Sequence, residues 1–355
     1  MGAADKTRRR HRRAILWSVI VILVGAMVLP LSGYVYVGFV SDTQAQSNQT
    51  QTNPRANYWR AVRDGDQGYV AASGPYTTNV LVQNGGQNWR QIRDGLVASY
   101  GAGLLGVAII VLLAFYAIRG SMRIEEGRSG VTVARWNAFE RLMHWYVAIL
   151  FIILAITGLS MLFGRAILIP WLGLAGFSAW AKVSITLHNF LGPLFIIGVA
   201  AMLVVWIKNN LPSSSDWEWF KSGGGVIKGK HVPAGKANAG EKLFVFWGGI
   251  ILCGIIVSAT GVILDFPLWG QTRGDMQLSQ LLHSSFALIW IAIIFGHAYL
   301  GTIGTEGAFE GMVSGRVDVN WAKQHHSEWY EDVKNTAERT DGQRPAAGAA
   351  GQEAG

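Results

Sequence analysis

The sequence contains a single cysteine, Cys253, among its 355 residues. An intrachain disulfide is therefore excluded, and so is an iron–sulfur cluster held by this chain alone, because such clusters use several cysteine thiolates. Covalent attachment of a c-type haem requires a C-x-x-C-H run and is excluded as well. Since Cys253 lies in an apolar stretch, we interpret it as a small packing residue. Any redox group in this chain must be held by other side chains.

Charged residues are also scarce. They make up 15% of the chain, whereas half of all residues are apolar; soluble domains usually carry about 25% charged residues. Six charge-free stretches exceed the roughly 18 apolar residues of a transmembrane helix: Ala14–Val40, Leu96–Ile118, Leu142–Gly164, Val183–Ile207, Leu243–Leu264 and Leu278–Thr305. The composition excludes a large soluble core and predicts an all-α integral membrane protein.

Positive charge is distributed unevenly between the two sides of these spans. One side carries 22 of the 30 Lys and Arg residues: the segment before the first span, the loops Arg119–Arg141 and Lys208–Lys242, and the tail from Glu306. The positive-inside rule places that side, with both termini, in the cytoplasm. The net charge of +8 is then a signal for topology and lipid headgroups, and nucleic-acid binding is not expected.

The first span, within residues 1–40, has two interpretations. Its basic start and apolar run fit a signal peptide that is removed. Its extension to Val40, with Tyr34 and Tyr36, fits a retained transmembrane helix slightly better. In both cases residues 41–95 form a periplasmic segment, and residues 96–118 form the next span.

The eight histidines fall into two groups. Four lie in polar stretches assigned to the cytoplasm, where we expect solvated side chains: His11, His231, His325 and His326. The other four lie in or at the edge of apolar spans: His144, His188, His283 and His297. An ionisable side chain is costly inside a bilayer, so these four are candidate functional residues. For each one alone, a hydrogen bond to a neighbouring helix is the alternative.

His283 and His297 are 14 residues apart in the last span. Fourteen helical steps return to within roughly 40° of the same face and rise about 21 Å, so the two imidazoles lie near opposite sides of the bilayer. The topology places His188 at the outer depth of His283, and His144 at the inner depth of His297. Two such pairs suit two haems, because a haem iron can take two axial side-chain ligands.

A transporter or metal-ion carrier that uses membrane histidines as ligands is a competing interpretation. Such proteins usually also have intramembrane carboxylates or broken helices. Asp265, at the boundary of a span, is the only nearby candidate. The histidine pairs therefore favour haem binding over transport.

Several ordered blocks of the sequence resemble one family, the gamma subunit of membrane-bound formate dehydrogenase, which is a cytochrome b. Besides the last span, they are Arg135–Trp145, Leu187–Gly192, Lys236–Lys242, Glu310–Val317 and Trp321–Tyr330. The likeness covers roughly Thr132 to Tyr330. It implies a four-helix bundle with two b-type haems, within residues 119–305, followed by a cytoplasmic tail at 306–355. The Ala/Gly-rich composition of the end, Ala346–Gly355, predicts disorder. The two N-terminal segments are additional to this bundle.

The resemblance also implies roles for particular residues. His188 and His283 are similar to the ligands of the outer haem, and His144 and His297 to those of the inner haem. The family's quinone pocket lies beside the inner haem, where Asn238, Gly240 and His297 match. From the residues alone, Asn238 also fits a helix cap. Glu241 stands where the family has Gln, and its carboxylate could deliver protons.

The function that this resemblance implies is electron transfer within a formate:quinone oxidoreductase of the bacterial inner membrane. A periplasmic iron–sulfur beta subunit would pass electrons from the molybdenum or tungsten catalytic alpha subunit through the two b haems to quinone on the cytoplasmic side. This chain has no residues for formate chemistry itself. A hydrogenase or thiosulfate reductase of the same diheme architecture is the alternative, although the Asn-Ala-Gly loop at Asn238 and the tail favour formate dehydrogenase.

Overall fold

The computed structural model describes residues 84–222 and 232–339. Within them, five helical segments are long and apolar enough to cross a membrane: Asn88–Arg119, Ala138–Ile167, Ile169–Asn210, Glu241–Asp265 and Arg273–Gly304. They correspond to five of the six predicted spans; the other, Ala14–Val40, lies outside the described residues. The predicted helical, multi-pass membrane fold is confirmed.

The chain divides into two compact units, Met1–Ile110 with Thr272–Gln277, and Val111–Gln271 with Leu278–Gly355. Helix α3 (Asn84–Gln91) continues through a π-helical stretch, Ile92–Val97, into α4 (Ala98–Arg119), whose residues up to Ile110 belong to the first unit. The helix therefore begins before the predicted start of this span at Leu96. The α4 sequence is apolar on all sides, as expected for a helix surrounded by lipid or other apolar surfaces.

The second unit contains the remaining spans. Helix α5 (Ala138–Ile167) begins at a capping box in which Asn137 and Glu140 satisfy one another's backbone N–H groups, a common device for helix starts. Helix α6 (Ile169–Trp206) follows almost directly and contains a kink at Gly173, where φ is 66°. Residues 165–182, which lie between two of the predicted spans, are therefore largely helical. Pro170, at the start of α6, favours this because its fixed φ suits the first helical turn.

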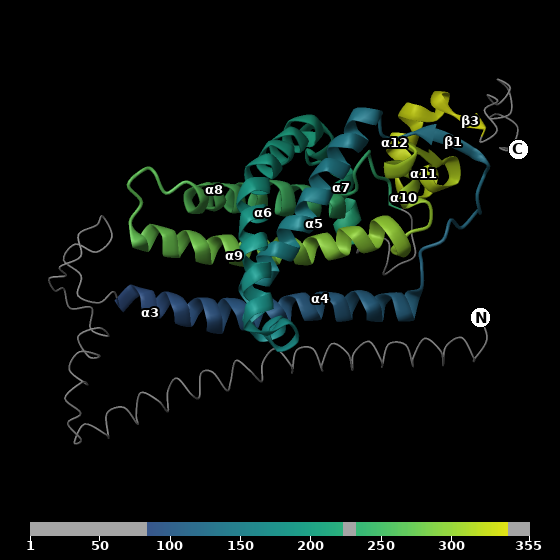
Figure 1. The fold of residues 1–355 in the computed structure, drawn as a ribbon. Coiled ribbons are helices and arrows are strands. Elements are labelled where there is room, and N and C mark those ends of the chain that lie inside the picture. Colours follow the sequence, from purple (N-terminus) through teal and green to yellow (C-terminus); the bar gives the residue numbers. More distant parts are fainter. Residues whose placement is uncertain (1–83, 223–231, 340–355) are drawn as a thin grey trace, which may run out of the picture. The chain divides into compact units, whose positions relative to one another are not determined.

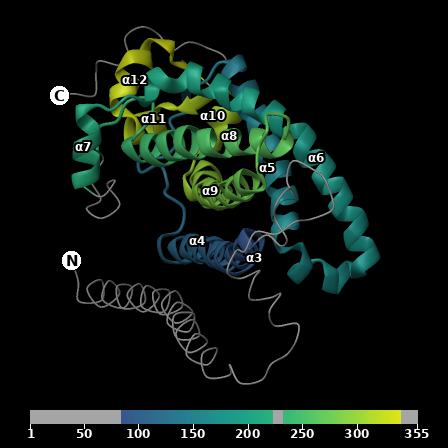
Figure 2. The same ribbon diagram turned by 90° about the vertical axis from the view of Figure 1, so that its left-hand side faces the viewer.

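Two further helical segments complete the bundle (Figures 1 and 2). A π-helical segment, Glu241–Cys253, leads into α8 (Gly254–Asp265), and α9 (Arg273–Tyr299) ends in the π-helical Leu300–Gly304. Figure 1 shows α5 and α6 side by side, crossing α8 and α9. The short helix α7 (Ser214–Lys221) lies between α6 and the residues 223–231 that are not described.

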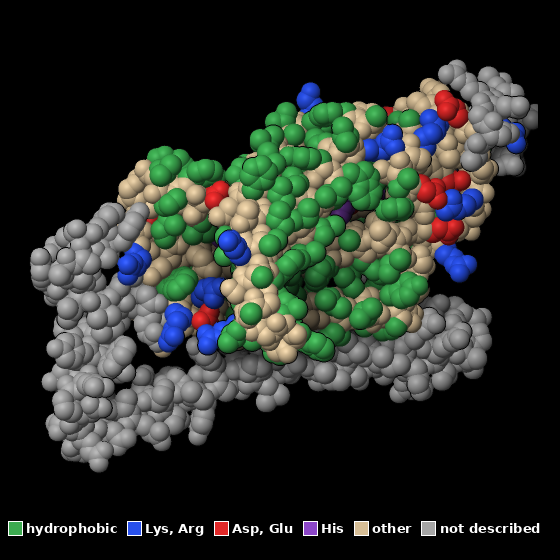
Figure 3. Space-filling model, in the orientation of Figure 1, with side chains coloured by type: hydrophobic (Ala, Val, Ile, Leu, Met, Phe, Trp, Pro, Cys, Tyr) green, Lys and Arg blue, Asp and Glu red, His purple; other side chains and the backbone are tan. Residues whose placement is uncertain are grey.

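The bundle core is apolar and closely packed. It is formed mainly by Met143, Val147, Leu150, Phe195, Val199, Met202, Phe246, Ile250, Cys253 and Trp290. Cys253 is buried there, as its interpretation as a packing residue predicts. The outer faces of the helices are apolar too, with Leu142, Phe190 and Val204 each more than 70% exposed. Figure 3 shows this apolar surface, while charged side chains gather over the C-terminal segment.

A small folded region, which we call the cap (residues 122–136 and 305–339), lies beyond the helices. Its three-stranded antiparallel sheet has the order β2 (Arg316–Asp318), β1 (Val131–Ala134), β3 (Glu338–Arg339), with Val133 opposite Val317. Helices α10 (Ala308–Val313), α11 (Val319–His325) and α12 (Ser327–Val333) complete it. Its core contains Val133, Val317, Trp321, Ala322 and Trp329. The sequence did not predict this sheet, because its strands are too short to display a clear alternation.

Gly315, at the turn between α10 and β2, provides a test of the cap. Its φ is +83°, a Cβ there would lie 2.5 Å from the Trp136 carbonyl oxygen, and its own carbonyl accepts from the N–H groups of Arg135 and Trp136. We expect Gly315→Ala to destabilise the cap by about 2 kcal/mol or more through backbone strain and steric clash. Tryptic cleavage after Arg316 or Lys323 should then be about 30-fold faster.

Gly106→Ala is the matched control, because a Cβ at Gly106 meets no atom within 4 Å and its backbone is ordinary. It should leave the cleavage rate unchanged. Equal rates in wild type and Gly315→Ala would contradict the packing described.

Candidate functional site

The four histidines predicted from the spans meet as two pairs. The ring centres of His144 on α5 and His297 on α9 are 6.1 Å apart, with an angle of 57° between the ring planes. The ring centres of His188 on α6 and His283 on α9 are also 6.1 Å apart, with an angle of 70°. This is the pairing that the depth argument predicts, although the role of these side chains as ligands stays a prediction.

The separation within each pair fits an iron atom held between two imidazoles. A metal–imidazole bond is about 2 Å, and the ring centre lies roughly 1 Å behind the nitrogen, so two rings on opposite sides of one metal are about 6 Å apart. Both pairs have this spacing. No group of three or more His, Cys, Asp or Glu side chains with metal-binding geometry occurs among residues 84–222 and 232–339. The arrangement therefore suits a cofactor that supplies its own equatorial ligands, such as haem.

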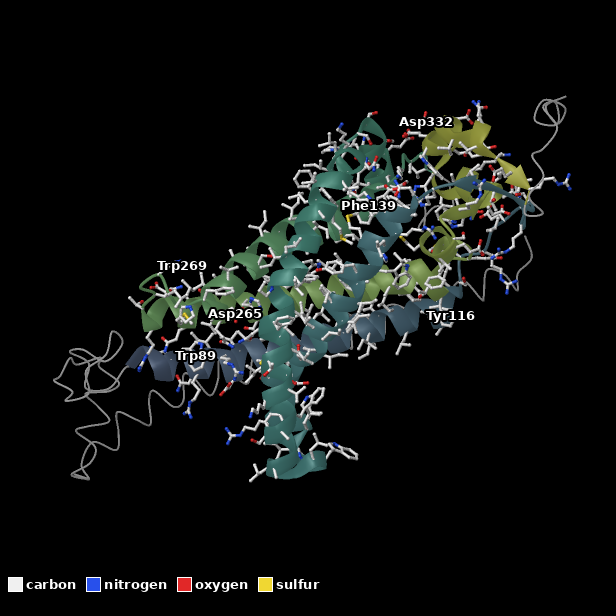
Figure 4. All side chains as sticks on the ribbon, turned by 45° about the horizontal axis from the view of Figure 1, so that its top comes forward. Trp89, Tyr116, Phe139, Asp265, Trp269 and Asp332 are labelled. Carbon is white, nitrogen blue, oxygen red and sulfur yellow. The ribbon has the colours of Figure 1, made fainter. Side chains whose placement is uncertain are left out.

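The pairs lie toward opposite ends of the bundle. Figure 4 shows Phe139, at the start of α5, and Asp332 of the cap toward one end, and Asp265 and Trp269 at the other. His144 lies one turn beyond Phe139, and the neighbouring Trp145 donates its Nε1–H to the Met312 carbonyl of the cap at 3.0 Å. This pair is thus the one nearer the cap.

The other pair is held by two threonines. Thr157 Oγ1 on α5 lies 2.9 Å from Nδ1 of His188, and Thr260 Oγ1 on α8 lies 3.2 Å from Nδ1 of His283. The same His283 nitrogen donates to the Val257 carbonyl at 3.0 Å. The sequence analysis did not identify these threonines. Each belongs to a Thr-Gly pair in an apolar span (Thr157-Gly158 and Thr260-Gly261), and this recurrence is a signal that could have revealed them.

Three aromatic rings lie between the two pairs. Trp290, midway between His283 and His297 in the sequence, is buried and contacts Phe151 and Phe195, with ring centres 5.4 and 5.5 Å away. Phe195 and Trp290 belong to the buried apolar core of the bundle, and Phe151 packs against it. The region is therefore a medium of low polarity separating two distinct sites.

The residues predicted for quinone binding occupy two places. His297 lies beside His144, whereas Asn238 and Gly240 lie in the turn that begins the helical segment at Glu241. Asn238 Oδ1 accepts from the Glu241 N–H at 3.0 Å, and the Glu241 carboxylate accepts from the Asn238 N–H at 2.9 Å. Asn238 is thus a helix cap, the alternative that its residue type suggested. A Cβ at Gly240 would lie 2.8 Å from the Trp219 ring, so only glycine fits there without a shift.

The turn before Asn238 is tied to the cap by three consecutive carbonyl groups. Ala234 accepts from the Glu328 N–H at 3.1 Å, Gly235 accepts from Nδ1 of His326 at 2.8 Å, and Lys236 accepts from Nη2 of Arg135 at 3.2 Å. The cap therefore holds in place the turn that presents Asn238 and Gly240.

His326 differs from its expected role, because it is 1% exposed and not a solvated side chain. With Nδ1–H donated to Gly235, its Nε2 accepts from Arg135 at 3.2 Å. Burial and the neighbouring Arg135 cation hold the pKa of His326 well below its usual value. Burial lowers the pKa of Arg135 to about 10, so its side chain stays charged at neutral pH, stabilised by cation–π contacts with Trp321 and Trp329. Sequence reasoning missed this cluster because the polarity of the tail suggested solvation.

Comparison with known proteins agrees with this architecture. The profile of the family described as prokaryotic cytochrome b561 matches residues 135–315, just over half of the chain. The chain is an integral membrane helical bundle with a pair of histidines toward each end. It belongs to the prokaryotic cytochrome b561 family.

Individual relatives within this family are subunits of formate dehydrogenases. The chain is 30% identical over 208 residues to the cytochrome b556 subunit of the nitrate-inducible formate dehydrogenase of Escherichia coli, covering 57% of this chain and 92% of that protein. It is 31% identical over 212 residues to a second Escherichia coli formate dehydrogenase cytochrome b556 subunit, covering 59% and 96%. The corresponding subunit of Haemophilus influenzae is 29% identical over 209 residues. The resemblance to formate dehydrogenase cytochrome b subunits is confirmed.

Because His326 is buried in its neutral form, we expect the cap to lose stability in acid. Because the pKa of His326 is lower in the folded chain than in the unfolded chain, the unfolded state binds a proton first as the pH falls below about 6.5. We expect the cap to lose up to about 1.4 kcal/mol per pH unit below that value. Hydrogen–deuterium exchange of residues 316–329 at pH 7.5 and 5.5, corrected for intrinsic rates, measures this loss.

His326→Gln should be less stable at pH 7.5 and should show a much weaker pH dependence, since Gln does not titrate. His325→Gln, at the last residue of the adjacent helix α11, is the matched control and should retain the wild-type pH dependence. A pH dependence removed by the His325 variant and retained by the His326 variant would refute the assignment.

Proposed function

We propose that this chain is the electron-transferring membrane subunit of a formate dehydrogenase complex, which passes electrons from an iron–sulfur partner subunit to quinone. The observation that carries the proposal is the spacing of the two histidine pairs, 6.1 Å between ring centres in each, in a chain of the cytochrome b561 family. The names of the relatives favour formate dehydrogenase over a hydrogenase or thiosulfate reductase of similar architecture. Formate oxidation itself is assigned to a molybdenum or tungsten catalytic partner subunit.

His188 and His283 would hold the outer haem, and His144 and His297 the inner haem. Haem b in these positions supplies a one-electron Fe(III)/Fe(II) couple that needs no covalent link to the chain. The four imidazoles would provide nitrogen ligands to the haem irons, within an apolar bundle core. The buried aromatic cluster at Trp290 separates the two positions.

We place the chain in the bacterial inner membrane with the cap in the cytoplasm. The support is electrostatic, because 22 of the 30 Lys and Arg residues fall on the side that includes the cap. The outer pair then faces the periplasm, where the iron–sulfur partner would dock. Residues 41–95 form a periplasmic segment in this orientation, with residues 1–40 as a retained span or a signal peptide.

Quinone would bind on the cytoplasmic side, near His297, Asn238 and Gly240. Asn238 uses Oδ1 in the helix cap, which leaves its amide N–H groups able to donate to a quinone carbonyl. The cap fixes the position of this turn through its three consecutive carbonyls.

Reduced-minus-oxidised spectra with haem quantitation test the first part of the proposal. We expect two b-type haems per chain in the wild type. His283→Ala should retain one, the inner haem, because one axial ligand of the outer haem is lost. His325→Ala, a histidine outside the pairs, should retain both. Two haems in the His283 variant, or none in the wild type, would contradict the ligand assignment.

Substitution of Asn238 tests the quinone site. Asn238→Ala removes both the helix cap and the amide donor, whereas Asn238→Asp keeps a capping oxygen and replaces the amide donor with a negatively charged carboxylate. Both variants should retain both haem spectra and reduce quinone at least about tenfold more slowly, since a hydrogen bond to the carbonyl is lost. If Asn238→Asp reduces quinone at the wild-type rate, Asn238 acts only as a cap.

A further inference from the structure

The two histidines of the outer pair are held by the same device on two different helices. In each case a threonine on the preceding helix contacts Nδ1, and the next residue is a glycine against the same ring. A Cβ on Gly158 would lie 3.2 Å from Cε1 of His188, and a Cβ on Gly261 would lie 3.2 Å from Cε1 of His283. A larger side chain at either glycine would push the imidazole away from its threonine.

The hydroxyl contacts determine which ring nitrogen carries the proton. Thr157 donates its own hydroxyl hydrogen to the Ile153 carbonyl at 2.8 Å, and Thr260 donates to the Ile256 carbonyl at 2.6 Å. Each hydroxyl oxygen is therefore left as an acceptor for the histidine Nδ1–H. For His283, the Val257 carbonyl at 3.0 Å requires the same tautomer, because a carbonyl can only accept. Both rings thus have an unprotonated Nε2 available for a metal.

The inner pair lacks this support at His144. Its Nδ1 is buried and has no hydrogen-bond partner, whereas both Nδ1 atoms of the outer pair have one. Donation from Nδ1–H to an oxygen increases the electron-donor strength of the imidazole toward a bound metal. A stronger donor stabilises Fe(III) relative to Fe(II). By itself, this difference would lower the reduction potential of a haem at the outer pair relative to one at the inner pair.

We propose that Thr157 and Thr260 are positioning residues that orient the ligands of the outer haem, fix their tautomer and lower its reduction potential. The inference rests on the proposed function, because it requires haem at His188 and His283. Its consequence is directional, since a lower outer potential favours electron movement from the outer position to the inner one. Each histidine also bonds to a backbone carbonyl of the preceding helix, His188 to Leu154 and His283 to Val257, so the two threonines have equivalent roles.

Potentiometric titration of the detergent-solubilised complex, followed optically and by electron paramagnetic resonance, tests this proposal. Thr157→Val keeps the shape of the side chain and removes the hydroxyl. We expect it to shift the Fe(III)/Fe(II) equilibrium of the outer haem toward Fe(II) by up to about tenfold, which corresponds to about 59 mV for a one-electron couple. Thr260→Val should produce a shift of similar size in the same direction, and the reduction potential of the inner haem should stay unchanged in both variants.

The low-spin ferric resonance signal of the outer haem should also change in Thr157→Val, because the ring of His188 is released from its orientation. Thr157→Ser should restore both the potential and the signal. Thr186→Val is the matched control: Thr186 is exposed on the helix of His188 and bonds only to the Lys182 carbonyl of its own helix, at 2.9 Å. It should leave both haems unchanged.

The outcomes separate this inference from the proposed function. A wild-type complex without haem refutes the proposed function, and the inference with it. Two haems in the wild type, with unchanged outer potential and signal in Thr157→Val, overturn the inference alone. If Thr157→Val loses the outer haem, retention of that haem at the wild-type potential in Thr157→Ser supports the inference, and its loss there as well overturns it.

Discussion

Imidazoles in an apolar bundle impose the main constraint on this structure. A polar group in the hydrocarbon region that lacks a partner costs several kcal/mol, so each ring nitrogen that finds a partner in the protein or in a ligand stabilises the bundle. In the outer pair, Nδ1 of each histidine is satisfied by oxygens of the neighbouring helix. The helices are close enough for this only because glycines lie where the rings approach. The small residues of the bundle thus serve both packing and ligand orientation.

In the cap, buried charged side chains likewise have partners within the protein. The buried Arg135 cation lies in the cap, outside the membrane-spanning helices. There it contacts the rings of Trp321 and Trp329 and the neutral His326. Because its contacts converge on three successive carbonyls before Asn238, the cap also fixes the turn that begins the next membrane helix. Polar chemistry is thereby placed at one end of an otherwise apolar bundle.

Several features could be predicted because they depend on local composition or on helical periodicity. Uncharged runs of about 20 residues have few stable alternatives to a membrane helix. In a helix, the 14-residue interval places His283 and His297 on the same face at two different depths in the membrane, independently of the neighbouring helices. Other features depend on partners distant in sequence. Thr157 and His188 are 31 positions apart, and Arg135 and His326 are 191 apart. Neither contact has a local signature, and the polarity of the tail even suggested the opposite environment for His326.

The sequence by itself determined the membrane class, five helices whose positions the structure reproduces, and the four histidines that qualify as ligands, because hydrophobicity and helical repeat act over short stretches of chain. Only the tertiary structure decided that residues 169–182 continue as helix beyond a kink, that the tail folds with residues 122–136 into a cap, and that two threonines orient the outer histidines. These features depend on contacts between helices and strands that are far apart in the sequence. The free energy of such contacts depends on geometry between distant segments, which no short stretch of sequence encodes.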